Sequence, residues 1–406
     1  MVQWALLFCG AVVHMQSCAY VNEVHFTQEQ TREYMPEIEQ VQQIDSQETQ
    51  EIQETQEAEI TAEEVISRGV SDIYYAYHAL DEQRQKIYLE MLDILTNMRE
   101  DVRISTMDKS VIDPVFACVM NDHPELFYVT GYQYTEYSFA NSITGYTFSG
   151  TYSMTEDEVE EANQLIEQSV QACLGQVSFE DEYSIVKSLY DWLIDHTEYD
   201  STVENNQNIC SVFLQGRSVC QGYAKAMQYL LQRLEKQCLL VTGFTNGERH
   251  AWNLVKVNGA YYYLDPTWGD ASYAYSGSTS DEGEFTLPSI NYDYFLVTTD
   301  EITRTHSFEL VVELPECVAV SENYYVHEGL YFDSYDESRL ADIFNSEQTK
   351  AANYVTVKCS DSQNYEQMMQ ELIDSQKIFN FIGQRDKSIA YASNEDQRTI
   401  SFWDIY

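Results

Sequence analysis

Residues 250–268 read HAWNLVKVNGAYYYLDPTW, and this stretch decides the fold of the central part of the chain. The pair Asn258-Gly259 lies between two segments that are rich in apolar and aromatic residues. Such a pair is the strongest short-range indicator of a β-hairpin with a two-residue turn. The turn places Val257 opposite Ala260, and this pairing fixes the register of both strands outward from it.

The predicted register brings two polar side chains close together. If the pairing continues along both strands, His250 lies opposite Thr267 and Trp252 lies opposite Asp265. Alternation then puts all four side chains on one face of the hairpin. His250 and Asp265 become diagonal neighbours, with Cβ atoms roughly 7–8 Å apart or less. A carboxylate at this separation accepts a hydrogen bond from an imidazole ring, which fixes the ring's tautomer and stabilises the imidazolium.

A helix predicted for residues 219–236 begins with a cysteine, Cys220. Ser218 is the predicted N-cap, so the thiol lies in the first turn, where unpaired N–H groups and the helix dipole favour a thiolate. The same N–H groups are candidates for one side of an oxyanion hole. Gly222 permits close packing of the helix backbone. One apolar stripe of the helix includes the cysteine: Cys220, Ala224, Met227, Leu231 and Leu234.

The spacing alone does not bring Cys220 to His250, because that contact requires the helix to pack on the hairpin. A single cysteine or histidine in such a position is more often structural than catalytic. The joint pattern with Asp265 in register favours a Cys-His-Asp triad. Trp252 and Trp268 are more simply interpreted as packing residues around this site than as substrate platforms.

Three segments together resemble the signature blocks of the transglutaminase-like superfamily. They are GRSVCQGYAKAMQYLL, RHAWNLVKV and YYYLDPTWGD, and the resemblance is specific over about 210–270 and looser over about 155–315. It implies an α+β fold with a papain-like transglutaminase core, in which a helix with an N-terminal cysteine packs on an antiparallel sheet. It also implies that Cys220 is the nucleophile, His250 its base and Asp265 the group that orients the base. Relatives include crosslinking enzymes, proteases and inert members, so the substrate stays open.

The chemistry that this resemblance implies is acyl transfer from a peptide or side-chain amide through a thioester on Cys220. Hydrolysis and transfer to an amine use the same acyl-enzyme, so the sequence does not separate a protease or amidase from a transglutaminase. Gln221 and Tyr199 are candidates for the second oxyanion donor, and no cofactor or metal is expected. The alternative is a cell-surface or wall-binding module on the same scaffold with an idle triad.

The composition limits the partners of the chain. Acidic residues outnumber basic ones by 67 to 22, which gives a formal net charge of −45 and argues against binding nucleic acid. A peptide or protein substrate, associated with a cell wall, is the expected partner. The nine cysteines show no paired spacing, so we predict reduced, partly buried thiols rather than disulfides.

The N-terminus predicts export. Residues 1–25 contain an apolar run from Trp4 to Val13, about the length of a signal-peptide core and too short to span a bilayer. Met15-Gln16-Ser17-Cys18 resembles a lipoprotein processing site, with a lipid anchor on Cys18. The cationic residues that normally precede such a run are missing, and a buried N-terminal strand or helix is the alternative. Export makes the expected location extracytoplasmic, secreted or membrane-anchored.

The remaining sequence predicts further units on both sides of the core. At 406 residues the chain is too long for one ordinary core. Thr155 with Glu158 forms a capping box before a helix, and the polar stretch at 269–285 is a predicted flap. The predicted C-terminal strands are 323–332, 353–359 and 388–393, with helices at 337–345 and 364–382. The predicted units are an acidic Gln/Glu-rich linker at 26–64, a helical region with a small sheet at 65–150, the catalytic core at 151–315 and a small α+β domain at 316–406.

Overall fold

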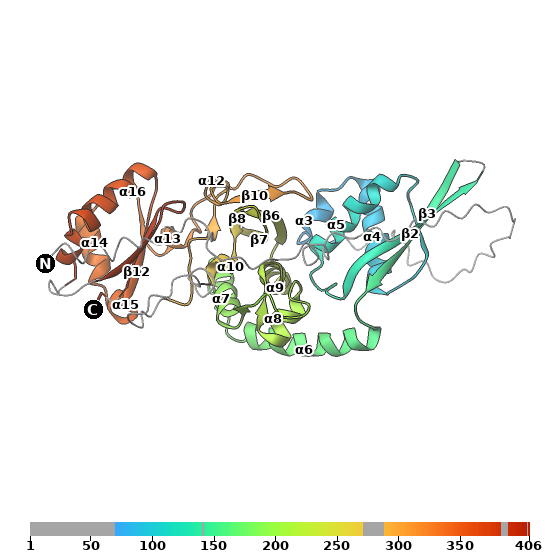
Figure 1. Ribbon diagram of the computed structural model, residues 1–406, viewed down its shortest axis with the longest axis horizontal. Helices are drawn as coiled ribbons and strands as arrows, with labels where there is room; N and C mark the ends of the chain where they lie inside the picture. Colours follow the sequence, from blue (N-terminus) through green and yellow to red (C-terminus); the bar gives the residue numbers. More distant parts are fainter. Residues whose placement is uncertain (1–69, 140–141, 271–287, 383–388, 404) are drawn as a thin grey trace.

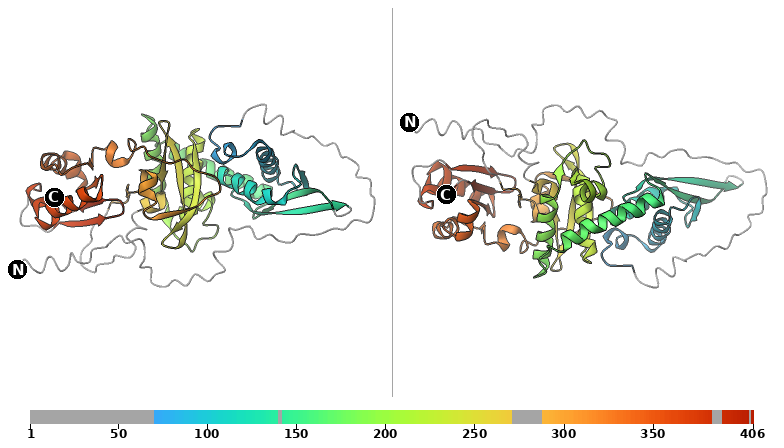
Figure 2. Two further views of the ribbon diagram at one scale, coloured as in Figure 1. Left: turned by 90° about the horizontal axis from the view of Figure 1, so that it is seen from above. Right: turned by 90° about the horizontal axis from the view of Figure 1, so that it is seen from below.

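The computed structural model describes five stretches of the chain, and three parts lie in a row along its longest axis (Figure 1). The two further views keep the same order (Figure 2). The predicted export segment, the acidic linker and most of the predicted flap fall outside the described residues. The described stretches are residues 70–139, 142–270, 288–382, 389–403 and 405–406.

The N-terminal part combines helices with a small antiparallel sheet, as the sequence predicts. Ile87, Met91 and Leu95 lie on the buried face of its longest helix, and Met98 follows the end of that helix with a φ of 48°. The strand order is β1-β3-β2. The elements are α3 (Tyr75–His78), α4 (Glu82–Thr96), β1 (Val102–Ile104), η1 (Lys109–Val111), α5 (Ile112–Asp122), β2 (Val129–Phe139) and β3 (Ser142–Tyr152).

A long helix, α6 (Glu156–Leu174), extends from the central part toward the N-terminal part (Figure 2). Its capping box is present as predicted: the Thr155 hydroxyl accepts from the N–H of Glu158, and the Glu158 carboxylate accepts from the N–H of Thr155. Two further helices and two short parallel strands follow. They are α7 (Glu182–Asp195), β4 (Glu198–Tyr199), α8 (Ile209–Gln215) and β5 (Arg217–Ser218).

The central sheet has five antiparallel strands in the order β10-β6-β7-β8-β9, and helix α9 (Cys220–Arg233) packs against β6 and β7. The predicted hairpin is formed by β7 and β8. Its register is confirmed from the pair Val257–Ala260 to the pair Asn253–Leu264. The strands are β6 (Cys238–Thr245), β7 (Glu248–Val257), β8 (Ala260–Leu264), β9 (Phe295–Val297) and β10 (His306–Glu309).

The predicted pairing is wrong beyond Leu264. Asp265 does not pair with Trp252, because the chain turns there into a short helix, α10 (Pro266–Gly269). Pro266 has no N–H to give to a ladder but suits the first position of a helix. Asp265 is the N-cap of this helix, and its carboxylate accepts hydrogen bonds from the N–H groups of Thr267 and Trp268. His250 and Thr267 are therefore not strand partners either.

The C-terminal part has a four-stranded sheet in the order β11-β12-β14-β13. The predicted strand at 323–332 is largely wrong, because Asn323 caps a helical turn, α13 (Tyr324–His327), and leaves only β11 (Tyr331–Phe332) extended. Strand β14 (Thr399–Trp403) and helix α15 (Glu347–Ala352) were not predicted. The remaining elements are α14 (Glu337–Phe344), β12 (Tyr354–Cys359), α16 (Ser362–Met369), η2 (Gln370–Asp374), η3 (Lys377–Asn380) and β13 (Ala390–Asn394).

Two separate hydrophobic cores stabilise these parts. One core joins the N-terminal and central parts, from Ala76 to Cys317, and the other fills the C-terminal part, from Phe332 to Ile405. The seven cysteines that the structure describes are all free, and six of them are buried, as predicted. In the part of the chain that the structure describes, no helix is both long enough and apolar enough to cross a bilayer.

Candidate active site

Cys220 lies at the first position of helix α9 and is half-buried. The residue that caps the helix is Val219, which has no capping side chain, so the predicted cap at Ser218 is wrong. The Ser218 hydroxyl instead donates to the carbonyl of Asn206 and lies 2.7 Å from the hydroxyl of Ser211. The N–H groups of Gly222 and Tyr223 donate to the carbonyl of Val219 at 2.9 and 3.1 Å, which leaves those of Cys220 and Gln221 as the candidate donors beside the thiol.

Gly222 explains how the start of helix α9 fits its surroundings. A Cβ atom at this position would lie 1.8 Å from the Ser218 hydroxyl oxygen and 2.9 Å from the Asn206 carbonyl oxygen. A larger residue would therefore push the first turn of the helix, and the thiol with it, away from the preceding loop.

The contact that the sequence could not predict is made by the packing of α9 on the central sheet. Cys220 packs against a small apolar cluster of Ala224, Leu240 and Ala251. The buried amide of Asn253 on β7 donates to the backbone carbonyl of Ala224 at 2.9 Å, which ties the helix to the strand that carries His250. The start of α9 and the start of β7 therefore face a common site.

His250 and Asp265 form a buried pair. The Nε2 atom of His250 lies 2.7 Å from Oδ2 of Asp265, and the two side chains are 4% and 0% exposed. Burial alone would lower the pKa of His250, but the Asp265 carboxylate and the neighbouring Cys220 side chain raise it to about 10. Because Nε2 faces Asp265, Nδ1 is the ring nitrogen that remains for the thiol.

The Asp265 carboxylate accepts from four donors. Oδ1 accepts from the N–H groups of Thr267 and Trp268 at 2.9 and 3.1 Å, while Oδ2 faces His250 and also Nε2 of a second histidine, His306, at 3.1 Å. Burial favours the neutral carboxyl, but the two histidines hold the pKa of Asp265 well below its usual range. The carboxylate is therefore ionised and fixed in orientation.

His306 is the residue that sequence reasoning missed. It opens β10 at the edge of the sheet next to β6, and it is 41 positions away from Asp265 in the chain. The segment HSFE that contains it has no motif that marks a site. Only the packing of β10 beside β6 brings its ring to the carboxylate.

The structure places the other predicted site residues, the two tryptophans, Gln221 and Tyr199, around the His250–Asp265 pair and the start of α9. Trp252 and Trp268 both have their ring centroids 6.0 Å from that of His250, and their indole N–H groups are buried without a hydrogen-bond partner. Gln221 follows the thiol in the first turn of α9 and is half-buried. Tyr199 is also half-buried and pairs with Ser218 in the short β4–β5 ladder, two positions before the thiol.

A metal is the alternative explanation for a cluster of two histidines and a carboxylate. One ligand atom from each of His250, Asp265 and His306 lies within 4.8 Å of the others. Both imidazole nitrogens, however, lie at hydrogen-bond distance from the same carboxylate oxygen. We therefore assign the cluster to hydrogen bonding, and the expected absence of a metal stays a prediction.

Comparison with known protein families identifies the fold of the central part. Residues 175–266 match the model of the transglutaminase-like superfamily, so the chain contains a transglutaminase-like core. This segment includes Cys220, His250 and Asp265 but ends before His306.

Similarity to individual proteins is limited to parts of the chain. The human kyphoscoliosis peptidase is 25% identical over 101 residues, which cover 21% of this chain and 15% of that protein. A crystal structure of a TGase has a TM-score of 0.26 at 13% identity and covers 39% of this chain and 53% of that chain. The periplasmic domain of TgpA from Pseudomonas aeruginosa has a TM-score of 0.21 at 15% identity and covers 32% and 57%.

Proposed function

We propose that this chain is a thiol-dependent acyl-transfer enzyme that acts on peptide or side-chain amides, with Cys220 as nucleophile, His250 as base and Asp265 as the group that orients the base. One observation carries the proposal: a buried His250–Asp265 pair at 2.7 Å lies beside a cysteine at the start of a helix. A histidine with its far nitrogen held by a carboxylate and its near nitrogen toward a thiol is the arrangement that activates a nucleophile.

The proposed reaction has two halves. In the first, the Cys220 sulfur forms a bond to the carbonyl carbon, the carbon–nitrogen bond breaks, and the proton held by His250 passes to the leaving amine. In the second, water or an amine gives a proton to His250 and attacks the thioester, and the carbon–sulfur bond breaks to restore the Cys220 thiolate beside protonated His250. The backbone N–H groups of Cys220 and Gln221, in the first turn of α9, are the proposed donors to the oxyanion. Gln221 and Tyr199 remain candidates for a second donor.

The proposed substrate is a peptide or protein outside the cytoplasm, associated with a cell wall. The apolar run Trp4–Val13 and the lipoprotein-like site at Cys18 support export, with a lipid anchor as part of the proposal. The net charge of −45 supports a soluble, acidic surface that does not bind nucleic acid.

The test is the alkylation of Cys220 by iodoacetamide, followed across pH by mass spectrometry of the peptide that contains residue 220. We expect selective alkylation at neutral pH in the wild-type protein and a rate at least tenfold lower in His250→Ala, because the variant lacks the partner of the thiolate. His78→Ala is the matched control, since His78 is exposed and belongs to α3 in the N-terminal part.

Equal and slow alkylation in the wild-type, His250→Ala and His78→Ala proteins would contradict the enzyme and favour the binding module with an idle triad. If alkylation is selective, incubation of peptide amides with and without an added amine separates the two enzyme classes. Hydrolysed product in both incubations indicates a protease or amidase, and an amine adduct indicates a transglutaminase.

A further inference from the structure

His306 donates a hydrogen bond to the carboxylate that orients the proposed base. Its Nε2 atom lies 3.1 Å from Oδ2 of Asp265, and its Nδ1 atom lies 2.8 Å from the hydroxyl oxygen of Thr305. Burial lowers the pKa of His306 despite the neighbouring carboxylate, so the ring is neutral. A neutral ring that faces a carboxylate through Nε2 carries its proton on that atom.

The ring of His306 is held in one orientation by aromatic neighbours on several sides. The rings of Trp252 and Trp268 each lie 4.8 Å away, and that of Tyr294 lies 5.5 Å away. The titratable groups that face His306 are Asp265, His250 and Tyr294. The ring is fully enclosed, and its side chain is 0% exposed.

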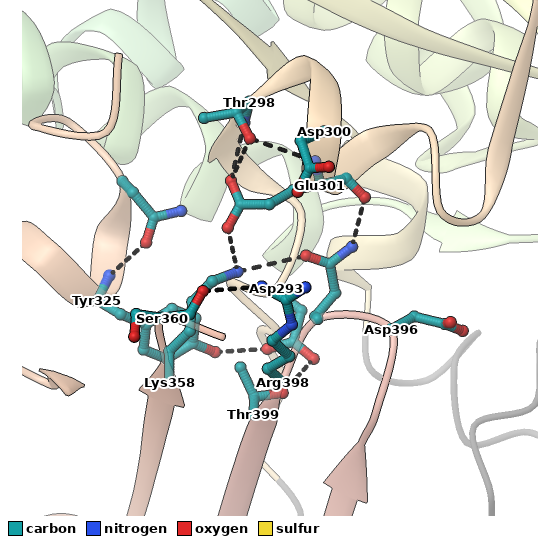
Figure 3. Close-up of polar contacts among 12 residues, drawn as sticks. Asp293, Thr298, Asp300, Glu301, Tyr325, Lys358, Ser360, Asp396, Arg398 and Thr399 are labelled. Atoms are coloured by element: carbon teal, nitrogen blue, oxygen red, sulfur yellow. Dashed lines mark hydrogen bonds and ion pairs between the residues drawn. The ribbon is translucent and has the colours of Figure 1, made fainter. Parts of the chain in front are cut away.

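The segment that precedes His306 is bound to the C-terminal part by an ion pair and hydrogen bonds. Glu301 belongs to α12 (Thr299–Ile302), and its carboxylate lies 2.8 Å from the buried ammonium group of Lys358 on β12 (Figure 3). Gln397 donates to the backbone carbonyl of Glu301 at 3.2 Å, and Arg304 donates to the carbonyl of Asp396 at 2.7 Å. These contacts lie within five positions of His306.

A second connection reaches the backbone of Asp265. The carboxylate of Asp293 accepts from the hydroxyl of Thr399 at 2.9 Å (Figure 3). It also accepts from the amide of Asn394 at 2.9 Å, and both donors belong to the C-terminal part. The next residue, Tyr294, accepts the N–H of Asp265 through its carbonyl at 3.0 Å. The C-terminal part therefore holds the neighbours of Asp265 at both its backbone and its side chain.

We propose that His306 is a positioning residue for Asp265 and that the C-terminal part, through the buried Lys358–Glu301 ion pair, keeps His306 in place. This inference rests on the proposed function. His306 shares the carboxylate oxygen that faces His250, so it both fixes the carboxylate and withdraws part of its negative charge from His250. Without His306, the full charge of Asp265 acts on His250 and binds its proton more tightly.

The experiment measures the rate of Cys220 alkylation by iodoacetamide between pH 5 and 11 in the full chain, with circular dichroism at each pH. For His306→Phe we expect the alkaline transition, in which His250 loses its proton, to move upward by about one pH unit. For His306→Gln, whose amide still donates to Asp265, we expect the transition to stay within about 0.3 of a pH unit of the wild-type value.

Lys358→Met tests the role of the C-terminal part. We expect it to move the same transition upward by roughly half a pH unit. The variant removes the ion pair that holds the segment before His306 but leaves the imidazole ring in place. Lys350→Met is the matched control in the same part, because Lys350 forms an exposed ion pair with Glu347. In the double variant His306→Phe/Lys358→Met the transition should match that of His306→Phe alone.

Unchanged transitions in folded His306→Phe and Lys358→Met would overturn the inference while leaving the proposed function intact, provided that His250→Ala still suppresses alkylation. The inference would also be overturned if His306→Gln moved the transition as far as His306→Phe does. The hydrogen bond donated to Asp265 would then not explain the shift. If His306→Phe does not fold, the comparison of Lys358→Met with Lys350→Met decides. If His250→Ala has no effect either, the proposed function itself fails.

Discussion

Asp265 in the candidate site and Asp122 at the end of α5 are both buried carboxylates that accept hydrogen bonds on both oxygens, yet their pKa values move in opposite directions. Asp122 accepts from the N–H groups of Ala76 and Tyr77 and from the hydroxyl of Tyr88. Burial outweighs these bonds and the effect of the nearby His123, and it raises the pKa of Asp122 to about 6. At Asp265 the two histidines outweigh burial and lower the pKa.

The difference teaches what a buried carboxylate needs in order to stay charged. At Asp122 the neutral donors, together with a histidine that is paired with Glu125, compensate only part of the cost of removing the charge from water. Histidines that contact the carboxylate directly, as at Asp265, compensate more. Asp122 is suited to joining α3 to α5 by hydrogen bonds, while Asp265 is suited to holding a positive charge on His250.

The largest expected effect comes from removing the Asp265 carboxylate, which is the hydrogen-bond acceptor in the candidate site. Asp265→Ala leaves two imidazole N–H groups and two backbone N–H groups without a partner, so we expect the free energy of unfolding to fall by about 4 kcal/mol. Urea denaturation measures this change, with Asp342→Ala as control, because the Asp342 side chain on α14 is exposed. A loss of less than 1 kcal/mol would show that water replaces the lost acceptor.

The next largest expected effect is the pH dependence that Asp122 gives to the free energy of unfolding. The raised pKa of Asp122 means that the folded chain binds its proton more tightly than the unfolded chain does, so this stability is present below pH 3.8 and is lost as pH rises through about 6. Against Asp122→Asn, which does not titrate, we expect the wild-type protein to lose roughly 3 kcal/mol over that range. The measurement is the difference between the two free energies of unfolding at a series of pH values. A constant difference would contradict the raised pKa.

The pH dependence of stability that Asp265 contributes has the opposite sign. Its lowered pKa contributes stability above pH 3.8, and that stability is lost as pH falls. The two carboxylates therefore give opposite slopes on the acid side, and only the slope of Asp122 extends toward neutral pH.

The smallest expected effect is the loss of one donor from Asp122. Tyr88→Phe removes a hydroxyl that lies 3.0 Å from the carboxylate, so we expect it to lower the free energy of unfolding by about 1 kcal/mol and to raise the pKa of Asp122 further. Urea denaturation at pH 7 gives the first value. Tyr137→Phe on β2 is the control, because Tyr137 is 39% exposed. Equal changes in the two variants would argue against a specific bond to Asp122.

Local signals in the sequence predicted much of the central fold. Asn258-Gly259 fixed the hairpin register because a two-residue turn leaves one pairing, and Thr155 with Glu158 marked the start of α6. The prediction failed at Pro266, where the lack of an N–H ended the ladder and a capping carboxylate replaced a strand position. The closeness of His250 and Asp265 was nevertheless predicted, because the register up to Leu264 already brings them together.

The remaining features depend on contacts that are distant in the sequence. The approach of Cys220 to His250 requires α9 to pack on β7, and the approach of His306 requires an edge strand from a segment beyond the hairpin. The strand predicted at 323–332 failed because the aromatic and β-branched residues at 324–326 fit both a strand and a capped helical turn. Asn323 as an N-cap was the overlooked signal.

The order of strands in the central sheet determines which segment of this core can be transferred to another protein. Strands β9 and β10 follow each other in the chain, yet they occupy opposite edges of the sheet, so the segment between them spans its width. A transplant or gene fusion that cuts after residue 266, where the family match ends, would carry the three side chains of the proposed triad. It would also leave β6 and β8 as unpaired edge strands. The smallest portable unit therefore extends at least through Glu309, and recombination points between 266 and 309 are expected to yield insoluble protein.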